Sequence, residues 1–150
     1  MAATFLFTGC GKDDDDAAKP SGKTYTPSVT ATVNSEPWTG VQAGSNNVMG
    51  IFVFEASDSK GSTIKFMGSP IDSIGTYNFK GQYIVPTGGG NATLYTTDFG
   101  GTSEFVVTKL DRTDHRISGT FKIESEKYSG TGPDSVVITN GVYTDVLFQE

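Results

Sequence analysis

Short β-rich segments alternate with turn residues over almost the whole chain, and this spacing constrains the fold more than any other feature. Valine, isoleucine, threonine and aromatic residues fill the segments, whereas glycine, asparagine, aspartate and proline separate them. No stretch of ten or more residues has the 3.6-residue period of an amphipathic helix. The pattern predicts an all-β domain with little or no helix, an antiparallel sandwich or closed barrel of about 8–10 short strands.

Individual segments indicate where strands and turns are expected. Residues 48–56 are apolar on both faces and predict a buried central strand, whereas residues 117–124 alternate as a half-buried strand does. Asn140-Gly141 is a preferred hairpin dipeptide and predicts a turn between strands at 135–139 and 142–148. Further strands are expected at residues 29–33, 38–41, 63–67, 77–79, 83–85, 92–96 and 104–110, and turns at 34–37, 44–47, 58–61, 86–91, 98–101 and 111–116.

The first ten residues end in the only cysteine of the chain, Cys10, directly after Gly9. Residues 2–9 are apolar or small, and no lysine or arginine precedes the cysteine. This segment resembles the lipobox of bacterial lipoproteins, which implies that Cys10 carries a lipid anchor. We interpret residues 1–10 as the remnant of a signal peptide that starts further upstream. The alternative is a cytosolic protein in which Gly-Cys occurs by chance.

A charged run and a linker follow the cysteine. Adjacent like charges repel and stay extended, so residues 11–27, with Pro20, Gly22 and Pro27, are expected to tether a single domain at 28–150. The run resembles the surface-export signal of Bacteroidota lipoproteins, which implies recognition by lipoprotein export machinery and a lipid-anchored position in the outer membrane at the cell surface. The residues implied in that signal are Lys12, Asp13, Asp14, Asp15 and Asp16.

Six short motifs recur in one order along the domain. They read ATVN at 31–34, WT at 38–39, GTY at 75–77, VTKLD at 107–111, ISGTF at 117–121 and ITNGVY at 138–143. In this order they resemble an uncharacterised family of Bacteroidota lipoproteins with a domain of unknown function. The resemblance implies an all-β fold and a surface location, and it carries no assigned activity. Around Ser73 and Ser135, the sequences DSI and DSV resemble the short O-glycosylation motif of exported Bacteroidota proteins.

The charge and the reactive residues exclude several functions. The formal net charge is −6 and lysine and arginine form no cluster, which argues against nucleic-acid binding. His115 is the only histidine, so we expect no metal site of the usual kind and no cofactor. A hydrolase stays open as an alternative, because His115 or the in-phase pair Glu124 and Glu126 can meet partners through folding. No G-x-S-x-G motif locates such a site.

Aromatic residues give the best indication of binding. The chain has ten phenylalanines, six tyrosines and one tryptophan, and most of them must build the core. Tyr95, Phe99 and Tyr128 lie in or beside expected loops, so we predict that they are exposed and contact a ligand. The leading hypothesis is a surface-tethered module that binds a glycan or a partner protein. The other alternative is a calycin-like carrier of an apolar ligand, which requires an empty apolar cavity of roughly several hundred Å³.

Overall fold

The computed structural model describes residues 22–150, and these residues form an all-β domain in which no helix occurs. The predicted fold class is therefore confirmed, and the first strand begins one residue after the predicted tether ends. The ten strands are β1 (Ser28–Val33), β2 (Glu36–Gly40), β3 (Gln42–Val48), β4 (Ile51–Ser57), β5 (Thr63–Gly68), β6 (Gly75–Tyr77), β7 (Lys80–Gly88), β8 (Asn91–Asp111), β9 (Arg116–Ser129) and β10 (Ser135–Gln149).

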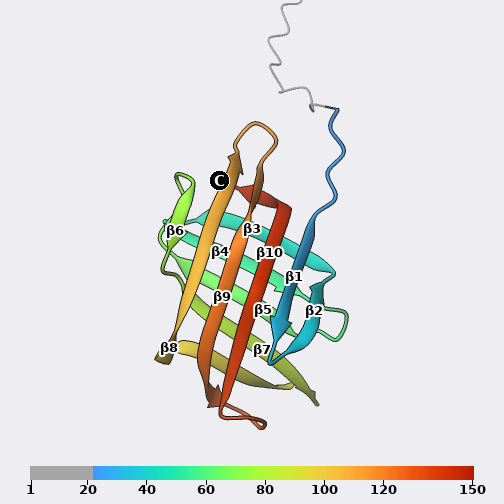
Figure 1. Ribbon diagram of the computed structural model, residues 1–150, viewed down its shortest axis with the longest axis vertical. Helices are drawn as coiled ribbons and strands as arrows, with labels where there is room; N and C mark the ends of the chain where they lie inside the picture. The colour runs from blue at the N-terminus through green and yellow to red at the C-terminus, as the bar shows by residue number, and fades with distance from the viewer. Residues whose placement is uncertain (1–21) are drawn as a thin grey trace, which may run out of the picture.

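All ten strands belong to one sheet that curls until two layers face each other. Figure 1 shows β8, β9, β10 and β1 in front, crossing β3, β4, β5 and β7 behind. Strands β3 to β10 follow one another as antiparallel neighbours, apart from β6, which pairs with β8. Only β10 and β3 pair in parallel, through Phe148 opposite Ser45 and Gln149 opposite Asn46. Because β9 also pairs with β10, the hydrogen-bonded neighbours form a closed circuit.

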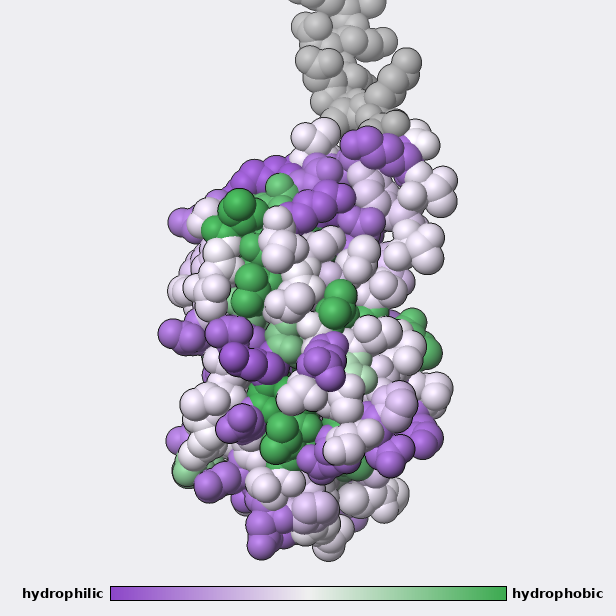
Figure 2. Space-filling view, viewed as in Figure 1, coloured by the Kyte–Doolittle hydropathy of each residue, from purple (hydrophilic) through white to green (hydrophobic). Residues whose placement is uncertain are grey.

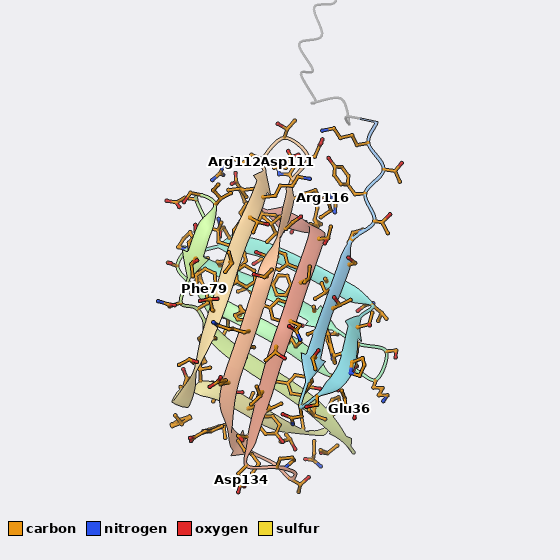
Figure 3. All side chains as sticks on the ribbon, viewed as in Figure 1. Glu36, Phe79, Asp111, Arg112, Arg116 and Asp134 are labelled. Carbon is orange, nitrogen blue, oxygen red and sulfur yellow. The ribbon has the colours of Figure 1, made fainter. Side chains whose placement is uncertain are left out.

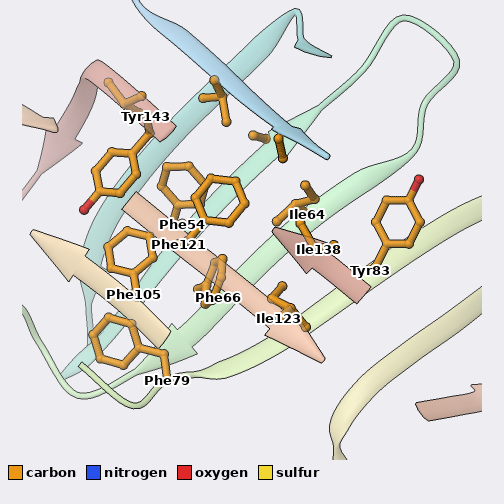
Figure 4. Packing of buried hydrophobic residues seen from close by; sticks show 14 of the residues in the cluster. Phe54, Ile64, Phe66, Phe79, Tyr83, Phe105, Phe121, Ile123, Ile138 and Tyr143 are labelled. Carbon is orange, nitrogen blue, oxygen red and sulfur yellow. The ribbon is translucent and has the colours of Figure 1, made fainter. Parts of the chain in front are cut away.

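Aromatic rings fill the space between the two layers. Phe54, Phe66 and Phe105 are completely buried, and the Phe105 ring centroid lies 5.3 Å from Phe54 and 5.0 Å from Phe66. Tyr143 stacks on Phe105 at 4.8 Å, and Figure 4 shows these rings converging from both layers. A carrier needs an empty apolar interior, whereas these side chains occupy the centre of the domain.

The long strands of the front layer differ from the predicted short ones. The predicted strands at 92–96 and 104–110 are both part of β8, and the predicted turn at 98–101 is a bulge inside it. Asn140-Gly141 is likewise a bulge within β10 and joins no hairpin, so that prediction was wrong. Both a bulge and a hairpin turn can use a residue with left-handed backbone geometry, and Asn140, with a φ of 52°, is such a residue. Sequence composition alone does not separate a bulge from a hairpin turn.

The second correction concerns the start of the back layer. Residues 44–47 were predicted as a turn, but they lie within β3, which pairs along its whole length with β4. The true turn is Met49-Gly50, where both residues have positive φ, of 53° and 78°. Such a two-residue turn suits the right-handed twist of a hairpin. Polar residues of β3 had the composition of a turn, although their backbone is fully extended.

The tether meets the domain at one end of the front layer. The Tyr25 ring lies 5.0 Å from the guanidinium carbon of Arg116, and its hydroxyl donates a hydrogen bond to Asp114. Lys23 forms an ion pair with the same carboxylate at 3.0 Å. Figure 3 places Arg116 at this end and Asp134 at the opposite end. Cys10 and the predicted export residues Lys12 to Asp16 lie outside the described residues.

Candidate functional site

Two exposed aromatic rings stack on each other at the end of the domain opposite the tether. The centroids of Phe99 and Tyr128 are 5.0 Å apart and their planes differ by only 8°. The residues are 65% and 59% exposed, which is unusual for rings this large. Tyr128 lies twelve residues beyond Arg116 along β9, or roughly 40 Å at the rise of an extended strand. We call this pair the Phe99–Tyr128 platform.

A bulge in β8 turns Phe99 outward. Thr96 pairs with Glu126 and Gly101 pairs with Ser125, so four residues of β8 are left between two adjacent positions of β9. Gly101 makes the return possible: its φ is 96°, and a Cβ there would lie 1.9 Å from the Glu124 carbonyl oxygen. No other residue type fits without moving the backbone of β9. The glycine therefore fixes the position of the exposed ring.

A second bulge, in β9, turns Tyr128 outward beside Phe99. Tyr95 pairs with Lys127 and Leu94 pairs with Ser129, which leaves Tyr128 as the extra residue. Bulges of this kind bend a strand and redirect one side chain, and they are frequent beside functional sites. Two adjacent strands each bulge here, and their two extra aromatic side chains meet.

Contacts to β7 hold the β8 bulge in place. Asp98 forms an ion pair with Lys80, and the Gly81 amide donates a hydrogen bond to the Thr97 hydroxyl at 3.2 Å. Within the bulge, the Asp98 amide donates to the Thr96 hydroxyl at 3.3 Å. Two successive residues of the bulge, Thr97 and Asp98, are thus tied to defined partners. The platform is consequently preorganised, which lowers the entropy cost of ligand binding.

Carboxylates flank the platform. The Glu126 carboxylate packs against Gly100, because a Cβ on that glycine would lie 2.7–3.0 Å from its carboxyl atoms. Gly100 is the residue after Phe99, and Glu126 lies two residues before Tyr128. Glu126 is exposed, so its oxygens are accessible to a ligand on the rings. Sequence periodicity placed Glu126 on the polar face of its strand but did not associate it with the aromatic residues.

Of the three predicted binding aromatics, Phe99 and Tyr128 are exposed together, whereas Tyr95 is not. Tyr95 is only 4% exposed and packs on Tyr83 at a centroid distance of 6.2 Å, so its assignment to an exposed binding surface was wrong. It precedes the bulge, and ordinary strand alternation points it inward. It lines a pocket of about 280 Å³ at this end of the domain.

Of the other residues considered for chemistry, His115 lies at the tether end of the domain, apart from the platform, whereas Glu126 flanks the platform. His115 is exposed on the turn between β8 and β9, and it has a φ of 52°. Its carbonyl oxygen accepts the Phe148 amide at 2.9 Å, which is a structural role. Glu124 and Glu126 both lie on β9, and within residues 22–150 no hydrogen bond joins either carboxylate to a hydroxyl group or to the histidine. In residues 22–150, no three histidine, cysteine or acidic side chains are grouped so as to hold a metal ion.

Ser73 and Ser135 are both exposed. Ser73 donates a hydrogen bond from its hydroxyl to Asp72 at 3.0 Å, within the motif that suggested glycosylation. Their modification stays a prediction.

Comparisons with family models, with curated proteins and with solved structures each returned no match. Over the described residues, no helix is long and apolar enough to cross a membrane. The sequence motifs and the geometry of the platform are therefore the features that indicate a function.

Proposed function

We propose that this chain is a surface-tethered binding module that holds carbohydrate on the Phe99–Tyr128 platform. One observation carries the proposal: two bulges expose two stacked rings at the end of the domain farthest from its tether. Burying one such ring removes roughly 150–250 Å² from water, so leaving two exposed forgoes substantial stabilisation. A ligand that covers the rings recovers that stabilisation as binding free energy.

Carbohydrate suits this surface because a sugar, like the platform and its flanking carboxylates, combines apolar and polar groups. A sugar ring presents an apolar face of C–H groups, which packs on an aromatic ring, and hydroxyl groups at its edge. The carboxylates of Asp98 and Glu126 accept hydrogen bonds from such hydroxyls. On the face of the domain seen in Figure 2, apolar side chains form small patches separated by polar ones.

The tethering part of the proposal is supported by the sequence. Gly9-Cys10 and the charged run at Lys12 to Asp16 resemble the signals of surface-exposed Bacteroidota lipoproteins. A lipid on Cys10 anchors the chain in the outer membrane after transfer by the export machinery. The linker joins the domain beside Arg116, so the platform faces away from the membrane. That orientation suits capture of extracellular material.

The proposal is tested by comparing three variants against a panel of neutral, acidic and amino-sugar oligosaccharides. We expect Phe99→Ala and Tyr128→Ala each to weaken binding roughly tenfold or more, as buried aromatic contacts at interface centres do. Val41→Ala is the matched control, because Val41 is 63% exposed in the connection between β2 and β3. Isothermal titration calorimetry on the full chain measures all four proteins. Unchanged affinity in both ring variants, or no binding to any panel member, contradicts the proposal.

A further inference from the structure

Acidic side chains near the platform outnumber the lysines. Lys80 is paired with Asp98, and Lys127 is paired with Asp134 at 3.0 Å. Lys122, further along β9, is paired with Glu104 at 3.3 Å. Each neighbouring lysine thus already has an acidic partner. Glu126, in contact with Gly100, has no lysine or arginine within ion-pair distance among the described residues.

Glu124 adds to this imbalance. It lies two residues before Glu126 on β9, and strand alternation places both carboxylates on the same exposed face. Like Glu126, it forms no ion pair within residues 22–150. A ligand on the rings of Phe99 and Tyr128 therefore lies in a negative potential that the local lysines do not cancel.

The rings themselves favour a cation. The face of an aromatic ring carries partial negative charge, so it attracts an ammonium group within about 6 Å of its centroid. Stacking leaves one face of each ring directed away from its partner. An amino group on the bound sugar is then attracted to a ring face and to the Glu126 carboxylate, which lies beside Gly100, the residue after Phe99.

We infer, on the basis of the proposed function, that the platform selects sugars with a free amino group. Hexosamine units are the ligand class that supplies both an apolar ring face and one positive charge. Uronic acids and sulfated sugars are repelled by Glu124 and Glu126. The same site thus binds amino sugars most tightly, neutral sugars less tightly and acidic sugars least.

A matched pair of ligands tests this order: an N-acetylglucosamine oligomer and the glucosamine oligomer of equal length. They differ only in the acetyl group that removes each positive charge. We expect the deacetylated oligomer to bind roughly 3- to 10-fold more tightly, from one exposed ion pair and one cation–π contact. Raising the ionic strength reduces the difference, because salt screens exposed charges.

Two acidic residues provide the variant and its control. Glu126→Gln keeps the shape of the side chain and is expected to abolish most of the preference, whereas Glu36→Gln removes one charge on β2 and leaves it intact. Equal affinity for both oligomers, or a preference that survives in Glu126→Gln, overturns the inference while the proposed function stands. Binding of neither oligomer, with binding of no other sugar, overturns both. Tighter binding of an acidic oligomer overturns the charge preference alone.

Discussion

Replacing Phe105 with alanine is expected to lower the free energy of unfolding by about 3–5 kcal/mol, the usual cost of deleting a buried phenylalanine ring. Phe105 is completely buried and lies at the centre of the aromatic core. Its ring contacts rings from both layers of the sheet, Phe54 behind and Tyr143 in front. The cavity left by alanine can close only in part, because hydrogen bonds between the surrounding strands restrict their movement.

Urea denaturation followed by tyrosine and tryptophan fluorescence measures this loss. Tyr128→Ala is the matched control, since it also deletes one aromatic ring but from an exposed position. We expect it to cost at most about 1 kcal/mol, mainly the stacking with Phe99. Similar losses in the two variants would mean that Phe105 does not lie in a packed core.

The second large effect is expected at Gly119 in β9, where alanine should destabilise the domain by about 3 kcal/mol, the upper part of the range for overpacking. A Cβ at this position would lie 1.8 Å from the Val106 carbonyl oxygen and 2.5 Å from the Tyr143 hydroxyl oxygen. That hydroxyl donates a hydrogen bond of 2.7 Å to the same carbonyl. Burial raises the pKa of Tyr143, so the hydroxyl keeps its proton and the bond persists at alkaline pH.

Gly44 provides the control for this substitution. It also lies in a strand, β3, but a Cβ added there meets no atom within 4 Å. Gly44→Ala is expected to change the free energy of unfolding by less than about 0.5 kcal/mol. The two variants are compared by thermal and urea unfolding. Equal stability of Gly119→Ala and Gly44→Ala would show that β9 does not approach Val106 and Tyr143 as described.

Sequence periodicity predicts the strands in which apolar and polar residues alternate, but it does not predict where a strand bends. Residues 117–124 alternate without interruption, and β9 includes all of them. The bend of β8 at 98–101 was predicted as a turn because glycine and aspartate favour both turns and bulges. Whether a turn or a bulge forms here depends on whether the neighbouring strand continues to pair beyond the bend. The residues that decide this belong to β9 and not to the bend.

Part of the candidate site was predictable from the sequence. Phe99 and Tyr128 were predicted to be exposed because they lie beside turn-forming residues, and both are. Tyr95 lies four residues before Phe99, and only the length of the bulge decides that one ring faces inward and the other outward. The position of Glu126 depends on pairing between β8 and β9, to which its own sequence gives no clue. Gly100-Gly101 directly after Phe99 was the available signal for a bulge.

The most direct test of the binding proposal is a nuclear magnetic resonance titration of the full chain with glucosamine and N-acetylglucosamine oligomers. Chemical-shift changes locate the ligand without any substitution. We expect the largest changes at Phe99, Gly100, Glu126 and Tyr128, with none at Tyr25 or Arg116 at the tether end. Saturable changes centred elsewhere, or no changes with either oligomer, would contradict carbohydrate binding at the Phe99–Tyr128 platform.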